Sequence, residues 1–343
     1  MLPQAATCNR HHGDLARPLQ FRSKAANIPG HLFPGFKTPD SVWKNDNSMS
    51  AASLIAGLEH IVRENEPLAP YTSLGIGGVA EFFAEPTTVE ELTELVRRFG
   101  AANQPMRLLG GGSNVLVRDE GVPGLVVHLG APEFCQLEAV GNQLHAGGGA
   151  RLSHFISTAV REGMAGPEQL VGIPGTIGGA LHANTGAGGF DIGSWLVRAE
   201  VLTRTGERLI RERNELVFSY RASSLNELVI LRATFGFERE SPSELTRRMQ
   251  KNWIVRRASQ PSLGEPAAYV FKDHGGESAA SLIERAGLKG TQVGEVEVLD
   301  RNCNYFVAKA GASSADFLRL VDLVRRQVED RLDIKLALAL QVW

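Results

Sequence analysis

The sequence predicts an α+β protein. Apolar residues recur with helical spacing, next to capping residues, over 88–99, 242–258 and 314–331. Short apolar runs bounded by glycine predict strands between these helices. Because helices and strands do not alternate one for one, the pattern favours an α+β arrangement over a doubly wound parallel sheet.

Two of the predicted helices carry start signals. Thr88 and Glu91 have the spacing of a capping box. Ser241 is followed by Pro242 and, three residues after the serine, by Glu244, which predicts the same arrangement. In chain order, helices are predicted over 51–64, 88–99, 152–162, 242–258, 278–286 and 314–331.

The strands are shorter and follow glycine or polar turns. Thr205 and Gly206 form the turn of a predicted hairpin. The stretch 71–85 is predicted to be a strand pair broken by glycines. Other strands are predicted over 106–109, 115–117, 125–129, 143–146, 195–203, 207–211, 229–237, 269–272, 305–308 and 334–343. We expect three parts after the first 50 residues: 51–118, 119–238 and 239–343.

Composition limits the classes of protein that fit. The 343 residues are 43% hydrophobic and 22% charged, with a net charge of −2, which is typical of soluble globular proteins and argues against nucleic acid as the main partner. The cysteines, Cys8, Cys135 and Cys303, are too widely spaced for a CxxC metal site or a disulfide framework. No run reaches the length of a membrane span. We expect a cytoplasmic monomer without a metal or a membrane partner.

Residues 1–50 differ from the rest of the chain. They contain five prolines and scattered basic residues, without apolar periodicity. This composition predicts a disordered extension, and it lacks the apolar core of a secretory signal. We hypothesise that Met49 is the true start of the protein, which the intact mass of the native protein would test.

The stretch LLGGGSNVLVR, residues 108–118, is the first candidate binding site. Gly110, Gly111 and Gly112 place no Cβ in the way, so the backbone can turn with positive φ and aim successive N–H groups at one point. Ser113 and Asn114 add side-chain donors. A diphosphate suits this geometry, whereas the alternative is a tight turn that binds nothing. The spacing matches neither the P-loop nor the GxGxxG fingerprint.

A second glycine-dense loop lies downstream. It reads VGIPGTIGGALHANTGA over residues 171–187. Two loops that both exclude bulky side chains suggest that one extended ligand is held along its length.

With both loops in view, the chain resembles the UDP-N-acetylenolpyruvoylglucosamine reductase family from about Leu68 to the C-terminus. The resemblance rests on motifs in a fixed order: YTSLGIGGVAEFF, LGGGSNVLVRDEG, GIPGTIGGALHANTGA, FSYRASS, VRRASQP, VFKD and LIERAGLKG, followed by the closing helix. It implies a two-part FAD-binding domain of type 2 (vanillyl-alcohol-oxidase or PCMH-like) and a C-terminal α+β substrate domain.

The family's activity is then the expected one. The resemblance implies an FAD-dependent oxidoreductase that uses NADPH to reduce UDP-N-acetylglucosamine enolpyruvate to UDP-N-acetylmuramate. This reaction belongs to peptidoglycan precursor synthesis, and so to cell-wall biogenesis, cell shape and cell division.

Matching positions imply site residues. Arg221 matches the family's catalytic arginine, since a guanidinium can hold an enol-carboxylate and stabilise its developing charge. Gly110 to Asn114 would hold the FAD diphosphate. The remaining implied FAD contacts are Ile173, Pro174, Gly175, Thr176, Gly178, Gly179, Asn184 and Ala187. The implied substrate contacts are Tyr220, Arg256, Gln260, Lys272 and Asn304.

The sequence departs from the family where a proton is delivered. Tyr269 stands at the position of the Ser or Cys proton donor, and Ala339 at that of a glutamate near the C-terminus. Asp273 and His274 replace the Asn and Pro that follow the lysine of the same motif, and Gly188 replaces a tyrosine. A well-placed phenol can donate a proton, so Tyr269 is the candidate replacement acid.

Three hypotheses remain open at this stage. The first is a working reductase with Tyr269 as its acid. The second is a divergent flavin oxidoreductase of the same fold that acts on another sugar nucleotide or small acid. The third is a non-catalytic FAD-binding paralogue that binds a UDP-sugar.

Overall fold

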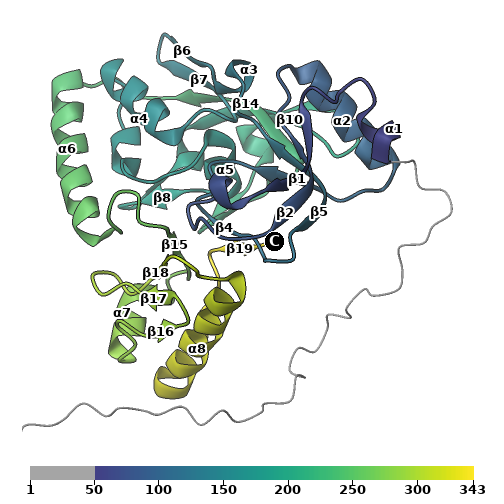
Figure 1. Ribbon diagram of the computed structural model, residues 1–343. Helices are drawn as coiled ribbons and strands as arrows, with labels where there is room; N and C mark the ends of the chain where they lie inside the picture. Colours follow the sequence, from purple (N-terminus) through teal and green to yellow (C-terminus); the bar gives the residue numbers. More distant parts are fainter. Residues whose placement is uncertain (1–50) are drawn as a thin grey trace, which may run out of the picture. The chain divides into compact units, whose positions relative to one another are not determined.

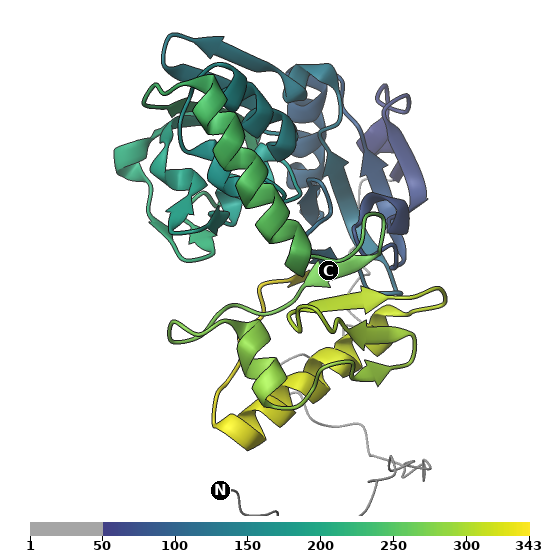
Figure 2. The same cartoon turned by 90° about the vertical axis from the view of Figure 1, so that its left-hand side faces the viewer.

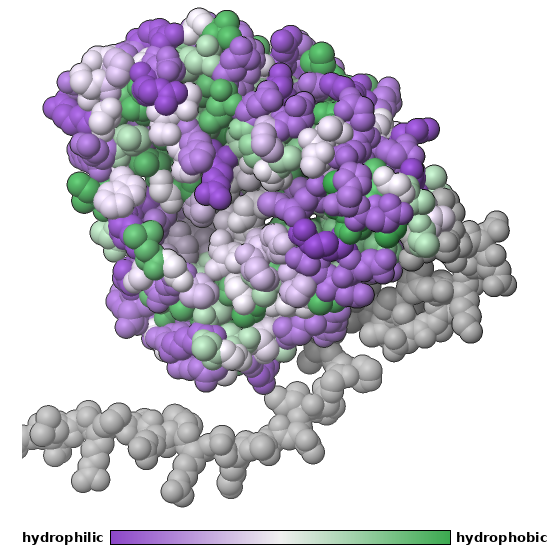
Figure 3. All heavy atoms as spheres, turned by 45° about the horizontal axis from the view of Figure 1, so that its top comes forward, coloured by the Kyte–Doolittle hydropathy of each residue, from purple (hydrophilic) through white to green (hydrophobic). Residues whose placement is uncertain are grey.

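The computed structural model describes residues 51–343. The predictions for residues 1–50, including a start at Met49, lie outside these residues. The face drawn in Figure 3 carries many hydrophilic side chains with hydrophobic ones scattered among them, which is usual for a protein surface. Among the described residues, no helix is both long and apolar enough to cross a membrane.

The first sheet is mixed and has the strand order β1-β2-β5-β3. Its first pair is antiparallel, whereas β5 runs parallel to both of its neighbours. Helices α1 and α2 pack on one face through a buried apolar cluster (Figure 1). The elements are α1 (Ala51–Ile55), β1 (Val62–Pro67), the 3₁₀ helix η1 (Ala69–Tyr71), β2 (Val79–Ala84), α2 (Val89–Ala101), β3 (Met106–Leu109), β4 (Val115–Leu116) and β5 (Val122–His128).

The predicted capping box at the start of α2 is confirmed. The Thr88 hydroxyl accepts a hydrogen bond from the Glu91 N–H at 3.2 Å, and the Glu91 carboxylate accepts one from the Thr88 N–H at 3.2 Å. Hydrogen bonds from the main chain and side chain of Thr87, among others, lower the pKa of Glu91 to about 2 even though partial burial opposes the shift. On the apolar side of the helix, Leu92, Leu95, Val96 and Phe99 are buried, whereas Val89, from the same apolar repeat, is only partly buried.

The second sheet is antiparallel throughout, with the order β11-β10-β14-β7-β6. Helices α4 and α5 contribute to the apolar cluster on one of its faces. The elements are α3 (Pro132–Cys135), β6 (Leu137–Val140), β7 (Gln143–Gly147), α4 (Leu152–Arg161), η2 (Pro167–Leu170), α5 (Ile177–His182), β8 (Gly186–Ala187), β9 (Phe190–Asp191), η3 (Ile192–Ser194), β10 (Leu196–Leu202), β11 (Arg208–Glu212), η4 (Arg213–Glu215), β12 (Phe218–Ser219), β13 (Ala222–Ser223) and β14 (Val229–Gly236).

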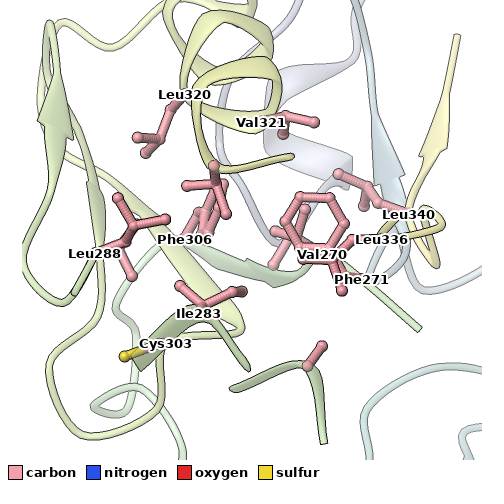
Figure 4. Close-up of a cluster of buried hydrophobic side chains, with 14 of the residues drawn as sticks. Val270, Phe271, Ile283, Leu288, Cys303, Phe306, Leu320, Val321, Leu336 and Leu340 are labelled. Atoms are coloured by element: carbon pink, nitrogen blue, oxygen red, sulfur yellow. The ribbon is translucent and has the colours of Figure 1, made fainter. Parts of the chain in front are cut away.

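The last part of the chain begins with the long helix α6, which lies beside α4 (Figures 1 and 2). A third sheet follows, with the order β15-β18-β17-β16, and it packs with α7 and α8 around a buried core (Figure 4). The elements are α6 (Pro242–Ser259), β15 (Ala267–Tyr269), α7 (Ala279–Arg285), β16 (Gln292–Val293), β17 (Val296–Val298), β18 (Tyr305–Ala308), α8 (Ser314–Leu332) and β19 (Gln341–Val342).

The final segment returns to the first part of the molecule. Strand β19 pairs in parallel with β4, just after the first glycine loop. Before it, Lys272 N–H donates to the Ala337 carbonyl at 2.8 Å, and Ala339 N–H donates to the Val270 carbonyl at 2.9 Å. The final segment is thus joined to residues 270–272 by these bonds and to the strand after the glycine loop by its pairing with β4.

Four predicted elements are wrong in detail. The helix over 51–64 ends at Ile55, because Gly57 has φ +76° and the chain then enters β1. The stretch 71–85 forms one strand rather than two, since Gly75 and Gly77 turn the chain with positive φ. The predicted strand over 334–343 is reduced to β19, and the one over 269–272 is regular only to Tyr269.

The capping box predicted for α6 is also wrong. The helix begins after Ser241 as expected, but the serine hydroxyl bonds to that of Ser243, at 2.8 Å. The Glu244 carboxylate pairs with Arg247 instead of reaching back to the main chain. The division of the chain at 118 and 238 stays a prediction; β5 lies beyond the first boundary but pairs in the first sheet.

Replacing Thr88 with alanine should destabilise the protein by about 1 kcal/mol, because one N–H at the start of α2 loses its acceptor. Urea unfolding followed by circular dichroism measures this. Thr246→Ala is the matched control, since its hydroxyl bonds to a carbonyl within α6 and its loss should change the free energy of unfolding by less than about 0.5 kcal/mol. Equal losses in the two variants would contradict the capping role.

Candidate active site

The two glycine loops meet at a contact between backbones. A Cβ on Gly111 would lie 3.0 Å from the Cα of Gly175, and one on Gly110 would lie 2.6 Å from the hydroxyl of Thr176. The Ser113 hydroxyl donates to the Pro174 carbonyl at 3.3 Å. The loops therefore lie side by side, as a single extended ligand would require.

Gly112 fixes the turn of the first loop. Its φ is +61°, and a Cβ there would lie 1.9 Å from the carbonyl oxygen of Tyr71. A larger residue is excluded both by this contact and by the backbone conformation. The loop is therefore held against η1 on one side and against the second glycine loop on the other.

Asn114 and Asn184 serve the protein's own backbone. The Asn114 amide donates to the Ala339 carbonyl at 2.9 Å, which ties the first loop to the final segment. The Asn184 amide donates to the Ser219 carbonyl at 2.9 Å and accepts from Gly193 N–H at 3.2 Å. Asn184 is 4% exposed, so its observed role is to hold the turn between β12 and β13. Direct contacts of either residue with FAD stay predictions.

Other parts of the second loop also use their polar groups internally. Gly178 N–H donates to the Gly148 carbonyl at 2.8 Å, and the Thr176 hydroxyl accepts from Gly179 N–H at 3.4 Å. Ile173 and Ala187 are partly buried and pack against the apolar cluster of the second sheet. These contacts define the shape of the loop.

Arg221 lies in the tight turn between β12 and β13. Its φ is +56°, a conformation that costs a residue other than glycine about 1–2 kcal/mol. The guanidinium carbon lies 5.9 Å from the ring centroid of Tyr220 and 5.9 Å from that of Tyr269. The structure thus brings together the predicted catalytic arginine and the predicted replacement acid, which are far apart in sequence.

Asp273 connects two of these side chains. The Tyr269 hydroxyl donates to one carboxylate oxygen at 3.2 Å, and the Tyr220 hydroxyl donates to the other at 3.1 Å. The N–H of Asp273 in turn donates to the Tyr220 hydroxyl at 3.2 Å. Burial, and then the negative charge of Asp273, raise the pKa of Tyr269. Sequence reasoning noted Asp273 only as a departure from the family pattern, and no spacing rule indicated this contact.

Arg256 and Gln260, at the end of α6, hold the segment that enters the second glycine loop. Arg256 donates to the carbonyls of Gln169 and Val171, and Gln260 donates to that of Gly172 at 2.9 Å. Burial lowers the pKa of Arg256. Both residues therefore position the loop, and their contact with a substrate stays a prediction.

Lys272 and Asn304 are the other two predicted substrate contacts from the last part of the chain. Lys272 is half-buried, and its N–H bonds to the final segment. Asn304 is 0% exposed, and its amide both donates to and accepts from the main chain of Phe271 at 2.8 Å. The Asn304 amide therefore holds the main chain of Phe271, and its contact with a substrate stays a prediction.

Ala339 lies next to the strand that carries Tyr269. It is half-buried, between Val270 and Asn114, to which its main chain is bonded. A methyl group can neither donate nor accept a proton. Tyr269 and Ala339, two of the departures noted in the sequence, therefore lie on neighbouring stretches of backbone.

The comparisons with known proteins define first a class and then a family. Residues 80–210 match an FAD binding domain, so the chain is an FAD-binding protein, and the glycine cradle without Cβ atoms fits a diphosphate-linked cofactor. Residues 260–343 match the C-terminal domain of UDP-N-acetylenolpyruvoylglucosamine reductase. The chain belongs to the UDP-N-acetylenolpyruvoylglucosamine reductase family. This confirms the resemblance and the fold class, an FAD-binding part with a C-terminal α+β domain.

Relatives and a solved structure support this membership. The chain is 42% identical over 286 residues to the reductase of Rhodopirellula baltica, covering 83% of this chain and 94% of the relative. It is 36% identical to that of Listeria innocua, covering 83% and 96%. The crystal structure of the enzyme from Thermus caldophilus matches with a TM-score of 0.71 and 34% identity, covering 82% of this chain and 99% of that one.

Gly111→Ala should lower the FAD content of the purified protein by at least about tenfold, because the added methyl pushes against the backbone of Gly175 and opens the cradle. The absorbance of flavin released by heating measures this content. Gly141→Ala is the matched control: it has φ +59° with no atom near its Cβ, so it should cost about 1 kcal/mol of stability and keep the flavin. Full FAD content in Gly111→Ala would contradict the cradle.

Proposed function

We propose that this protein reduces UDP-N-acetylglucosamine enolpyruvate to UDP-N-acetylmuramate, with FAD as cofactor and NADPH as hydride donor. It acts as a cytoplasmic monomer in peptidoglycan precursor synthesis. The observation that carries the proposal is the position of Arg221 beside Tyr269, in a chain that belongs to this family and has an FAD-binding part. The proposed division of labour assigns 51–118 and 119–238 to FAD and 239–343 to the substrate.

Glycine loops hold the cofactor in this proposal. Gly110 to Asn114 bind the diphosphate, and 173–180 pass along the flavin. When bound, FAD supplies the hydride transfer between NADPH and the enolpyruvyl double bond. The protein contributes shape and charge, and both loops are already held together by the contact between Gly111 and Gly175.

Arg221 and Tyr269 act on the substrate. The guanidinium binds the substrate carboxylate and stabilises the negative charge that develops on it as the double bond is reduced. The Tyr269 hydroxyl then gives its proton to the carbon of the enolpyruvyl double bond that does not receive the hydride. Burial and the charge of Asp273 raise the pKa of Tyr269, so it is protonated in the neutral range but is a weaker acid than a free tyrosine, and the positive charge of Arg221 acts in the opposite direction. Tyr220, Lys272, Arg256 and Gln260 complete the substrate side.

One observation favours a second candidate function. Ala339 provides a methyl where the family has a carboxylate, so one group of the family's site is missing. A related oxidoreductase acting on another sugar nucleotide, or an FAD-binding protein that holds a UDP-sugar without reducing it, would tolerate this loss. Both alternatives would bind FAD, but neither would reduce UDP-N-acetylglucosamine enolpyruvate.

Turnover of the full-length protein tests the proposal. Purified protein should oxidise NADPH only when UDP-N-acetylglucosamine enolpyruvate is present, and the product should be two mass units heavier than the substrate. Absorbance at 340 nm and mass spectrometry measure the two quantities. Oxidation of NADPH at the same slow rate with and without the substrate would support the second candidate instead.

Tyr269→Phe should reduce kcat by about 10²–10⁴-fold, the usual contribution of a general acid, because the ring stays and only the hydroxyl is lost. KM should change little, since substrate placement depends on other groups. Tyr71→Phe is the matched control, because its hydroxyl bonds to Glu66 and Arg63 on the first sheet. Unchanged kcat in Tyr269→Phe would show that another group delivers the proton.

A further inference from the structure

A continuous chain of hydrogen bonds runs from an exposed phenol to a half-buried one. Tyr220 is 55% exposed and donates to the Asp273 carboxylate, whose other oxygen accepts from Tyr269. Tyr220 belongs to the turn between β12 and β13, whereas Tyr269 ends β15 and Asp273 follows four residues later. The carboxylate therefore bridges two phenols from different parts of the chain.

The same carboxylate lies in a site that has lost another one. The final segment, which runs beside 270–272, carries Ala339 and has no acidic residue after Asp333. Ala339 bonds to Val270, at one end of the stretch 270–272, whereas Asp273 follows its other end and contacts the Tyr269 hydroxyl. Its charge is therefore available to the phenol that stands at the family's proton-donor position.

Two roles are possible for a carboxylate in this place. Asp273 accepts a hydrogen bond from Ala279 N–H at 2.9 Å, at the start of α7, so it supports that helix. An uncharged asparagine would keep an acceptor for the same N–H, and this distinguishes a supporting role from a role in proton delivery.

We propose that Asp273 is a positioning residue for proton delivery, linking Tyr220 to Tyr269 and replacing the carboxylate that Ala339 no longer supplies. The proposal rests on the proposed reductase function. It assigns Tyr220 the outer position and Tyr269 the inner one, next to the substrate. Arg221, whose guanidinium lies near both rings, faces the same group of side chains.

The proton transfers balance. The Tyr269 O–H bond breaks as the new C–H bond forms on the substrate, and the phenolate is stabilised by Arg221. The Tyr220 hydroxyl protonates the Asp273 oxygen that it contacts, rotation of the carboxyl group turns this proton toward the Tyr269 phenolate, which takes it, and Tyr220 takes a proton from water. One proton thus moves from solvent to substrate, and all three side chains return to their starting states.

The surroundings of Tyr269 set its titration. The charged and titratable groups that face it are Asp273, Tyr220 and Arg221, with Tyr305 in ring contact at 5.5 Å. Burial raises the pKa of the neighbouring Tyr305, and the positive charge of Arg256 opposes this shift. Asp273 is the negative charge in this group, so its removal should lower the pKa of Tyr269 whether or not the substrate is bound.

The test compares Asp273→Asn with the wild-type holoenzyme. We expect kcat to fall about 10–100-fold with KM changed less than about threefold, and the pKa of Tyr269 to fall. The ultraviolet difference spectrum of tyrosinate, with Tyr269→Phe as the blank, measures that pKa. Adding Ala339→Glu to Asp273→Asn should restore at least about tenfold of the lost kcat, a rescue that support of α7 alone would not produce.

Glu277→Gln is the matched control, because this nearby carboxylate bonds to Arg285 and Ser281 instead of to the tyrosines. Its kcat should stay within about twofold of the wild type. Unchanged kcat and unchanged titration of Tyr269 in Asp273→Asn would overturn the proposal, as would a loss of kcat that Ala339→Glu does not restore. A wild-type protein without turnover would overturn the reductase function, whereas the titration still reports whether Asp273 acts on Tyr269.

Discussion

The site depends on the contact between two backbones that carry no Cβ, at Gly111 and Gly175. This contact brings the loop after β3 against the loop before α5, although β3 belongs to the first sheet and α5 packs on the second. It leaves a surface of main-chain groups that suits a diphosphate-linked cofactor. Side chains behind the loops hold this arrangement: Arg256 and Gln260 bind the entry of the second loop, and Asn114 joins the first loop to the end of the chain.

The last residues of the chain connect the third sheet to this cradle. They bond to 270–272 and then pair with β4, so Tyr269 is held near the loop that follows β3. Asn184 performs a similar task on the other side by holding the turn that carries Arg221. The reactive groups therefore come from turns and strand ends, and the three sheets determine where those turns lie. A strained Arg221 and a shared carboxylate at Asp273 are the local consequences of this convergence.

Local sequence signals predicted much of the fold, whereas the roles of the site residues stay predictions. Thr88 and Glu91 identified the start of α2 because a capping box involves only neighbouring residues. The helix predicted over 51–64 was wrong because the chain turns at Gly57 and then pairs with β2. Apolar periodicity gives no information about such pairing with a distant strand. Asp273 was missed for the same reason: its two phenol partners meet it through the tertiary structure. Asn304 shows the converse, since a motif indicated the residue but only the structure showed that its amide serves Phe271.

An anaerobic absorbance experiment on the holoenzyme tests the central claim most directly. NADPH should bleach the flavin absorbance, and UDP-N-acetylglucosamine enolpyruvate added afterwards should restore it rapidly without oxygen. Bleaching and recovery together would mean that the cradle, Arg221 and a proton donor work as one site despite the loss of the carboxylate at Ala339. Bleaching that the enolpyruvyl substrate does not reverse would contradict the account, because the flavin would then be functional while the substrate side of the site is not.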